Sequence, residues 1–173
     1  MVTVIASTNR PESLTEIVAQ KYFALVKSKE SDAKYFSLQQ LTTNFFHPNM
    51  YEKKDESLIA LVEEFIAPSD KLVFIIPEYN GSYPGILKCF LDMVHPKYFR
   101  EKKAGIIGIS DGHAGNLRGQ EHLNGVLQHL RMLVHFAQPK LSDINKMMND
   151  DLEIVDERVL RLLHDHAERM INF

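Results

Sequence analysis

The chain has 173 residues, of which 45% are hydrophobic and 25% are charged. This is the composition of one soluble globular domain, and it excludes a disordered, collagenous or membrane-embedded polypeptide. Twenty Lys and Arg against 23 Asp and Glu give a net charge of -3, which is too balanced for the cationic surface that nucleic acids and anionic membranes bind.

Cys89 is the only cysteine, so the chain has no intramolecular disulfide and no cysteine-rich zinc site. The eight histidines show no metal-binding spacing, and no metal site is expected. The amino terminus shows no secretory signal features, and no apolar run approaches the roughly 20 residues needed to cross a membrane. We therefore expect a cytoplasmic protein.

The chain begins with a strand, a helix and a second strand. Val2 to Ala6 is an uncharged, β-branched run typical of a strand buried on both faces. Ser13 and Glu16 have the spacing of a capping box, and apolar residues then repeat at helical intervals to about Lys29. Lys34 to Leu38 predicts a second, weaker strand.

The next segment is a long loop followed by a helix and a strand. Gln39 to Asp55 shows neither strand nor helix periodicity, and loops of this length are often functional. An apolar helical stripe then runs over residues 58–66 and is stopped by Pro68. Lys71 to Ile76 predicts a buried strand, which Pro77 ends because proline cannot donate to a central ladder.

The alternation continues to the carboxyl terminus. Ile86 to Val94 predicts a helix, Ala104 to Ile109 a strand, and Ser110 to Gly119 a glycine-rich turn. Gln120 to Leu133 predicts a further helix, and a fifth strand is expected near Val134 to Leu141.

A final amphipathic helix is expected from about Asp156 to Ile171, and no interdomain linker interrupts residues 1–173. Strands that alternate with helical crossovers form a parallel sheet covered on both faces. We predict a single α/β domain, a doubly wound sheet of five parallel strands in the order 2-1-3-4-5.

Ligands of such sheets bind beyond the carboxyl ends of the strands. Three loops rich in hydroxyl, amide or glycine residues leave these ends, at Ser7 to Ser13, Pro77 to Pro84 and Ser110 to Gly119. The first loop precedes a helix amino terminus, whose free N–H groups and dipole favour an anion, and Arg10 adds charge-assisted hydrogen bonds. We expect a phosphate there, with Ser13 either contacting it or only capping the helix.

These loops carry three sequence signatures. The first, Gly-Ser-x-Arg-x-x-Ser, is matched by Ser7, Arg10 and Ser13 when Thr8 and Asn9 span a gap. The second, Pro-Glu-Tyr-Asn-Gly-Ser followed by Pro-Gly-x-Leu-Lys, is matched by Pro77 to Ser82, Pro84, Gly85, Leu87 and Lys88. The third, Ser-x-Gly-x-x-Gly, is matched by Ser110, Gly112 and Gly115.

With these signatures, nearly the whole chain resembles the NADPH-dependent FMN reductase family of flavodoxin-like proteins, which includes quinone, azo and chromate reductases. The resemblance implies a flavodoxin-like fold, FMN as cofactor and NADPH or NADH as electron donor. It further implies a quinone-like or xenobiotic small molecule as acceptor, and a homodimer or homotetramer.

The resemblance also implies the contacts to FMN. The phosphate would be held by Ser7, Arg10 and Ser13. The flavin ring would lie against the loop of Pro77, Glu78, Tyr79, Asn80 and Gly81, with Ser110, Gly112 and Gly115 at its other edge. Gly81 would let the backbone approach the ring and donate its N–H to flavin N5. No catalytic side chain is implied, because the flavin carries the chemistry.

Two other functions stay open. The first is a flavodoxin-like electron carrier or redox-sensing module without NAD(P)H turnover, although such carriers tend to be strongly acidic. The second is a serine esterase, since residues 108–112 match the nucleophile elbow Gly-x-Ser-x-Gly, and Asp143 or Asp150 and His164 follow Ser110 in triad order. The roughly sixty residues after Ser110 are too few for the strands that such a hydrolase needs.

Two further features have no assigned role. His113 lies in the glycine-rich loop, where it could contact cofactor or substrate or be a solvated loop residue. Phe45, Phe46 and Tyr51 could cover the sheet edge, line a subunit interface or wall the substrate site.

Overall fold

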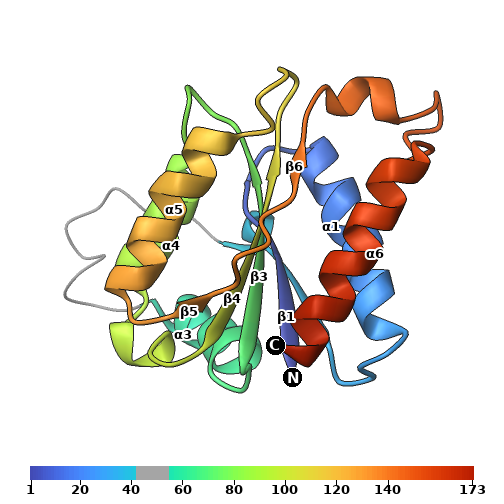
Figure 1. Ribbon diagram of the computed structural model, residues 1–173. Helices are drawn as coiled ribbons and strands as arrows, with labels where there is room; N and C mark the ends of the chain where they lie inside the picture. Colours follow the sequence, from blue (N-terminus) through green and yellow to red (C-terminus); the bar gives the residue numbers. More distant parts are fainter. Residues whose placement is uncertain (42–54) are drawn as a thin grey trace.

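The computed structural model of the chain describes residues 1–41 and 55–173. The aromatic residues Phe45, Phe46 and Tyr51, and most of the long segment from Gln39 to Asp55, lie outside the described residues. The described chain forms one parallel sheet with helices on both faces (Figure 1). Its strands are β1 (Val2–Ala6), β2 (Lys34–Ser37), β3 (Lys71–Pro77), β4 (Lys103–Ile109), β5 (Leu133–Val134) and β6 (Lys140–Leu141).

The strand order β2-β1-β3-β4-β5, with every described ladder parallel, confirms the predicted order 2-1-3-4-5. The centre of the sheet is fully buried: all residues of β1, and β3 from its second residue on, are buried. The switch in strand order lies between β1 and β3, whose following helices pack on opposite faces. Both loops at this point therefore open onto the same crevice.

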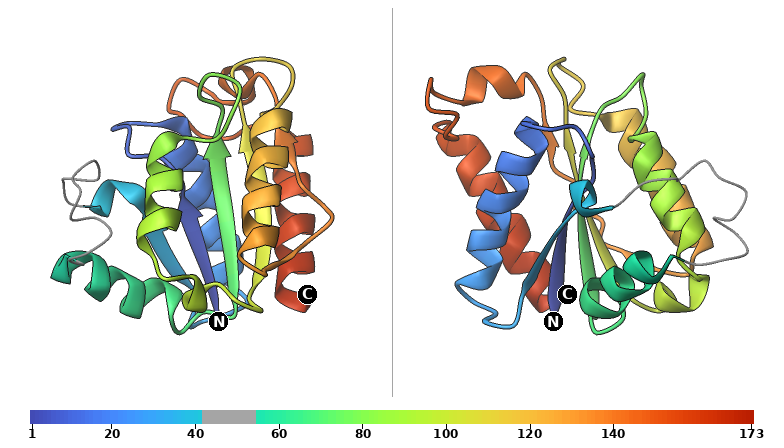
Figure 2. Two further views of the ribbon diagram at one scale, coloured as in Figure 1. Left: turned by 90° about the vertical axis from the view of Figure 1, so that its left-hand side faces the viewer. Right: turned by 180° about the vertical axis from the view of Figure 1, so that it is seen from behind.

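Among the described residues, two helices cover one face of the sheet and three cover the other (Figure 2). The first pair is α1 (Leu14–Lys27) and α6 (Glu157–Asn172); the opposite group is α3 (Glu56–Leu61), α4 (Gly85–Met93) and α5 (Leu117–His129). Each face has its own buried apolar cluster, and β1 and β3 contribute alternate residues to both. This three-layer arrangement is the one that the alternation of elements predicts.

The predicted fifth strand is two short strands that both pair with β4. Ala104 pairs with Val134 and Gly108 with Lys140. Between these two pairs the edge segment advances by six residues, whereas β4 advances by four. The extra residues loop out of the sheet, and Phe136 at this place is 81% exposed. A continuous strand over this range is therefore wrong.

The boundaries of two other elements also differ from those expected. Pro77 is the last residue of β3, paired in register with Ile109, because a strand's final position does not need its N–H. Helix α5 begins three residues before the expected Gln120 and ends four before Leu133. Its end is fixed by Arg131, whose φ of 63° turns the chain toward β5. Helix α3 continues into a wider turn over Val62–Ile66, which completes the predicted stripe.

Candidate functional site

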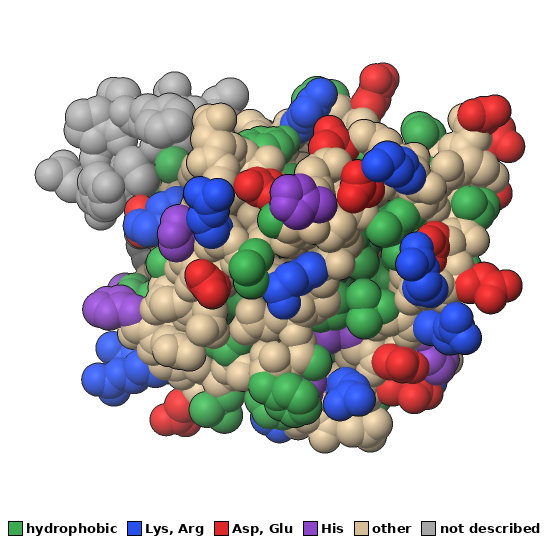
Figure 3. Space-filling model, turned by 45° about the horizontal axis from the view of Figure 1, so that its top comes forward, with side chains coloured by type: hydrophobic (Ala, Val, Ile, Leu, Met, Phe, Trp, Pro, Cys, Tyr) green, Lys and Arg blue, Asp and Glu red, His purple; other side chains and the backbone are tan. Residues whose placement is uncertain are grey.

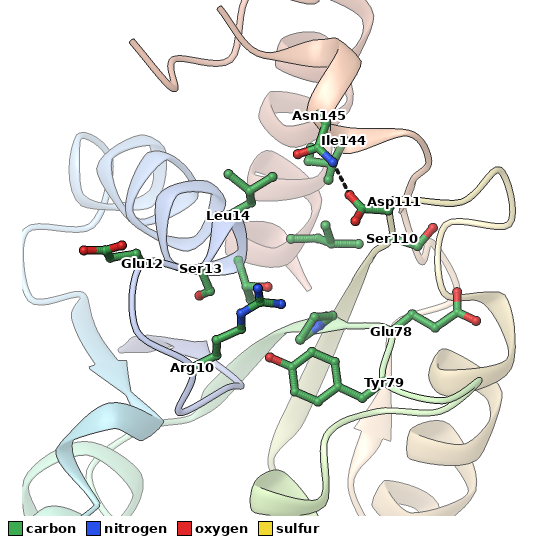
Figure 4. Close-up of a pocket in the computed structure, with 13 residues that line it drawn as sticks. Arg10, Glu12, Ser13, Leu14, Glu78, Tyr79, Ser110, Asp111, Ile144 and Asn145 are labelled. Atoms are coloured by element: carbon green, nitrogen blue, oxygen red, sulfur yellow. Dashed lines mark hydrogen bonds between the residues drawn. The ribbon is translucent and has the colours of Figure 1, made fainter. Parts of the chain in front are cut away.

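A cavity of about 350 Å³ opens at the carboxyl ends of the central strands (Figure 4). It is lined by Arg10, Glu12, Ser13, Leu14, Thr15, Pro77, Glu78, Tyr79, Ile109, Ser110, Asp111, Ile144 and Asn145. Figure 3 turns this edge toward the reader and shows acidic and basic side chains intermixed across it. The cavity occupies the crevice that the fold predicts for a ligand, and its volume suits a small organic molecule.

One end of the cavity combines a helix amino terminus with an arginine. Ser13 caps α1, with its Oγ accepting the Glu16 N–H at 3.2 Å. Leu14 and Thr15, the first residues of α1, line the cavity, and first-turn amides of a helix have no carbonyl partner within it. The Arg10 side chain extends toward Ser13 and the cavity (Figure 4). Free amides and a guanidinium together suit a phosphate group.

The predicted capping box is only half formed. Glu16 does not return its carboxylate to the residue that caps α1; instead, it accepts hydrogen bonds from Tyr35 and from Ser37, the latter at 2.9 Å. Both partners belong to β2, so the first turn of α1 is tied to the edge of the sheet. The burial of Tyr35 and its bond to Glu16 raise the pKa of the phenol. These bonds hold the first turn of α1 against β2.

Ser7 and Thr8 follow β1 and are fully buried, but their hydroxyls have different partners. Ser7 Oγ donates to the Ile5 carbonyl at 3.3 Å, and Ser7 does not line the cavity. Thr8 Oγ1 accepts the Arg10 N–H at 3.2 Å and lies 2.7 Å from Tyr79 Oη. Thr8 was not among the predicted site residues, although it stands two residues before Arg10, which is the Ser-to-Arg spacing of the first signature without any gap.

The second loop forms the floor of the cavity. Glu78 and Tyr79 line it directly after β3, together with Pro77. The next residues, Asn80 and Gly81, have φ angles of 52° and 75°. They form a two-residue turn closed by backbone bonds of 2.9 and 3.1 Å between Tyr79 and Ser82. Positive φ at both central positions is what a type I′ turn requires, and Asn-Gly is its preferred pair.

The third loop contributes Ser110 and Asp111. Ser110 is buried, and its Oγ donates to the Gly112 carbonyl at 2.6 Å. Asp111 accepts a hydrogen bond from the Asn145 side chain, drawn as a dashed line in Figure 4. Ile144 and Asn145 come from the segment after β6, for which sequence analysis predicted no site residue.

The two predicted glycines of this loop do not line the cavity, and their surroundings differ. Gly115 has a φ of 58°, and a Cβ added to it would lie 2.6 Å from Lys140 Cβ. Only glycine fits where this loop passes β6. Around Gly112, by contrast, an added Cβ would meet nothing within 4 Å.

A cationic side chain that sequence analysis missed lies beside the second loop. The Arg118 guanidinium, from the first turn of α5, is 3.6 Å from the position that a Cβ on Gly81 would take. One turn further along α5, His122 Nδ1 is 2.9 Å from Ser82 Oγ. Within residues 1–41 and 55–173, Arg118 has no ion pair. The approach of α5 to this turn is a tertiary contact that local sequence patterns do not show.

The structure does not assemble the hydrolase triad. Ser110 bonds to a backbone carbonyl and is not among the residues with positive φ, whereas a nucleophile elbow is a strained turn. His164 lies on α6 beside Asp165 and Glu168, and it does not line the cavity. Among the described residues there is no cluster of three or more His, Cys, Asp or Glu that could hold a metal ion.

Comparisons with known sequences indicate a reductase. A model of the NADPH-dependent FMN reductase family matches residues 1–144. A 2-hydroxy-1,4-benzoquinone reductase of Burkholderia sp. is 27% identical over 144 residues, which are 81% of this chain and 76% of the relative. An FMN-dependent NADPH-azoreductase of Staphylococcus aureus is 31% identical over 136 residues, which are 76% of this chain and 67% of the relative.

Solved structures show the fold. A flavoenzyme NAD(P)H:(acceptor) oxidoreductase of Paracoccus denitrificans superposes with a TM-score of 0.80 at 23% identity, over 99% of this chain and 94% of the other. An archaeal flavodoxin superposes with a TM-score of 0.60 at 16% identity, over 98% and 96% of the two chains. The expected flavodoxin-like fold is confirmed. No helix in the described ranges is long and apolar enough to cross a membrane.

Proposed function

Because the chain belongs to the NADPH-dependent FMN reductase family, with FMN as cofactor and NADPH as electron donor, we propose that it reduces a quinone-like or xenobiotic small molecule at the cavity beyond β1, β3 and β4. The acceptor class rests on the relatives, which are named a benzoquinone reductase and an azoreductase. The observation that carries the proposal is the cavity itself, with an anion-binding end next to an aromatic floor.

The residues of the cavity suit FMN at its phosphate end. Arg10, Ser13 and the amides of Leu14 and Thr15 surround one corner, and a dianionic phosphate satisfies these donors together. Thr8 holds the Arg10 backbone in place through the 3.2 Å bond to its N–H. In this proposal the predicted phosphate contacts of Arg10 and Ser13 stand, and the role of Ser7 is to brace β1 through its bond to Ile5.

The other end suits a flat ring. Tyr79 offers an aromatic face, and the loop of Asn80 and Gly81 brings backbone close to the cavity without a bulky side chain. Ser110 and Asp111 stand across from it on the third loop. In this proposal Pro77, Glu78, Tyr79, Asn80, Gly81 and Ser110 flank the ring. Gly112 and Gly115 shape the third loop, with Gly115 doing so through its packing on Lys140.

Bound FMN would supply the redox chemistry, which is hydride acceptance from the nicotinamide and electron donation to the acceptor. The protein supplies orientation, hydrogen bonds and a wall that excludes competing reactions. We infer that donor and acceptor use one exposed face of the ring in turn, since one cavity lies at the loops that follow β1, β3 and β4.

Reduction of the purified holoprotein by NADPH without oxygen tests the proposal. We expect the flavin absorbance to bleach on mixing with NADPH and to return when a soluble quinone is added. Steady-state rates should give parallel double-reciprocal lines, because the two substrates share one face. Intersecting lines would place the acceptor at a separate site, and flavin reduction no faster than in free solution would favour the electron carrier.

Assembly and location stay predictions. Because the family commonly forms dimers or tetramers, we propose a homodimer or homotetramer in the cytoplasm. Analytical ultracentrifugation of the holoprotein checks the first, and a monomer at micromolar concentration would contradict it.

A further inference from the structure

The hydroxyls of Thr8 and Tyr79 lie 2.7 Å apart across the switch point of the sheet. Thr8 is two residues beyond β1 and Tyr79 two beyond β3, and Ala6 pairs with Ile75 where these parallel strands run together. After this point the chain turns to α1 on one face and to α4 on the other (Figure 2). The bond therefore joins two loops that otherwise diverge.

The Thr8 hydroxyl has a second partner on its own loop. Its Oγ1 accepts the Arg10 N–H at 3.2 Å, a local turn of the kind that Ser and Thr form with the amide two residues on. Thr8 has no exposed surface, so water cannot replace either partner. One hydroxyl thus fixes the backbone of Arg10 and the phenol of Tyr79 together.

Tyr79 is held at both ends, by hydrogen bonds of its backbone and of its hydroxyl. Its backbone is closed onto Ser82 by two hydrogen bonds, and the neighbouring Glu78 N–H donates to the Ile109 carbonyl at 2.9 Å. With the hydroxyl also bonded, the ring has little freedom to turn. Figure 4 shows it on the cavity floor, with its hydroxyl directed toward the Arg10 loop.

We propose that Thr8 is a positioning residue that couples the two ends of the flavin site: its hydroxyl sets the phosphate-binding loop and the Tyr79 ring at one fixed separation. The β-branched side chain suits this role because its χ1 rotamers are restricted, so the hydroxyl direction is set before a ligand arrives. This inference rests on the proposed function and adds a residue without direct contact to the flavin ring.

Binding of FMN and of riboflavin to the apoprotein tests the coupling. Thr8→Val keeps the shape and removes the hydroxyl, and Tyr79→Phe removes the other partner. Each substitution should lower the affinity for FMN about 3- to 10-fold, the range for one net hydrogen bond. The double variant should lose no more affinity than either single variant. Thr8→Val should lower the affinity for riboflavin by a similar factor, although riboflavin has no phosphate. Thr8→Ser should restore most of both affinities.

Two results would overturn the coupling. The first is additive loss in the double variant, and the second is a Thr8→Val protein that binds riboflavin normally but FMN weakly, which would confine Thr8 to the phosphate loop. Tyr79→Phe, at a half-buried position, keeps the test decisive if Thr8→Val folds poorly. A wild-type protein that binds neither flavin would instead remove the proposed function, and this inference with it.

Discussion

The hydroxyl of Tyr22 lies 2.8 Å from Nδ1 of His166, and this bond joins α1 to α6 on the face of the sheet that these two helices cover. Both side chains are buried. Burial raises the pKa of Tyr22. Burial, with the nearby His135 and Arg169, lowers the pKa of His166 to about 4. Both groups are therefore neutral at pH 7.

Stability should fall as the pH falls from about 6.5 toward 4. Over this window an unfolded histidine takes up a proton that folded His166 does not, so the unfolded state binds more protons and is favoured. The shift corresponds to a loss on the order of 3 kcal/mol. Urea unfolding between pH 7 and pH 4 measures it. His166→Asn, whose amide can still form a hydrogen bond with the Tyr22 hydroxyl, should flatten the pH dependence of stability, and substitution of the exposed His164 by Asn should not. If the free energy of unfolding of His166→Asn depends on pH as steeply as that of wild type, another titrating group causes the pH dependence.

Arg10→Ala should weaken the binding of FMN by about 1.5 to 3 kcal/mol, or roughly 10- to 150-fold, because the energies of hydrogen bonds to a charged group lie in this range. Riboflavin, which lacks the phosphate, should bind wild type and variant alike. Titration by flavin fluorescence measures both affinities. Arg161→Ala, which removes an exposed arginine from α6, is the control and should change neither. If FMN loses no more than riboflavin, Arg10 does not hold the phosphate.

The fold was predictable because its decisive signals are local. The uncharged runs Val2 to Ala6 and Leu72 to Ile76 are strands buried on both faces, and this pattern is typical of parallel sheets. The helix start that lines one end of the cavity was predictable for the same reason, since its cap, Ser13, and Arg10 stand together in sequence. The edge was not: β5 and β6 have two residues each, too few for any periodicity.

Residues placed by tertiary contacts escaped prediction. Ile144 and Asn145 reach the cavity because β6 pairs with β4, a pairing without a local signal. Ser7 was predicted as a site residue and Thr8 was not, because the direction of each side chain at the end of β1 has no local signal. Successive residues of a strand face opposite sides, and it is the Thr8 hydroxyl that lies next to the Tyr79 hydroxyl.

Two glycines with the same predicted role should respond differently to alanine. Gly115→Ala should destabilise the fold by about 1 to 3 kcal/mol, since its φ is positive and the new Cβ would press on Lys140. Gly112→Ala meets open space and should stay within about 0.5 kcal/mol of wild type. Chemical denaturation of both apoproteins compares them. Equal losses would mean that the third loop is not shaped by packing on β6.

Arg118→Ala should raise the KM for NADPH more than that for NADH. Its guanidinium lies beside the turn of Gly81 but does not line the cavity, and it has no ion pair in the described chain. It is therefore available to the extra phosphate of NADPH, which lies far from the nicotinamide. A phosphate hydrogen bond of about 1.5 to 3 kcal/mol corresponds to at least a tenfold change. FMN affinity should stay constant. Equal changes for the two donors would show that Arg118 does not discriminate between them.

Ser110→Ala separates the reductase from the esterase. In the structure the hydroxyl donates to the Gly112 carbonyl at 2.6 Å, so its loss should cost about 0.5 to 1.5 kcal/mol of loop order or flavin affinity. If Ser110 were a catalytic nucleophile, its removal would instead lower the rate by about 10⁶. We expect the variant to keep bound FMN and most NADPH oxidation. Wild type should resist a fluorophosphonate probe, because Ser110 has no activating histidine among its described hydrogen-bond partners. Rapid stoichiometric labelling of Ser110, with ester hydrolysis abolished in the alanine variant, would establish the hydrolase and remove the reductase proposal.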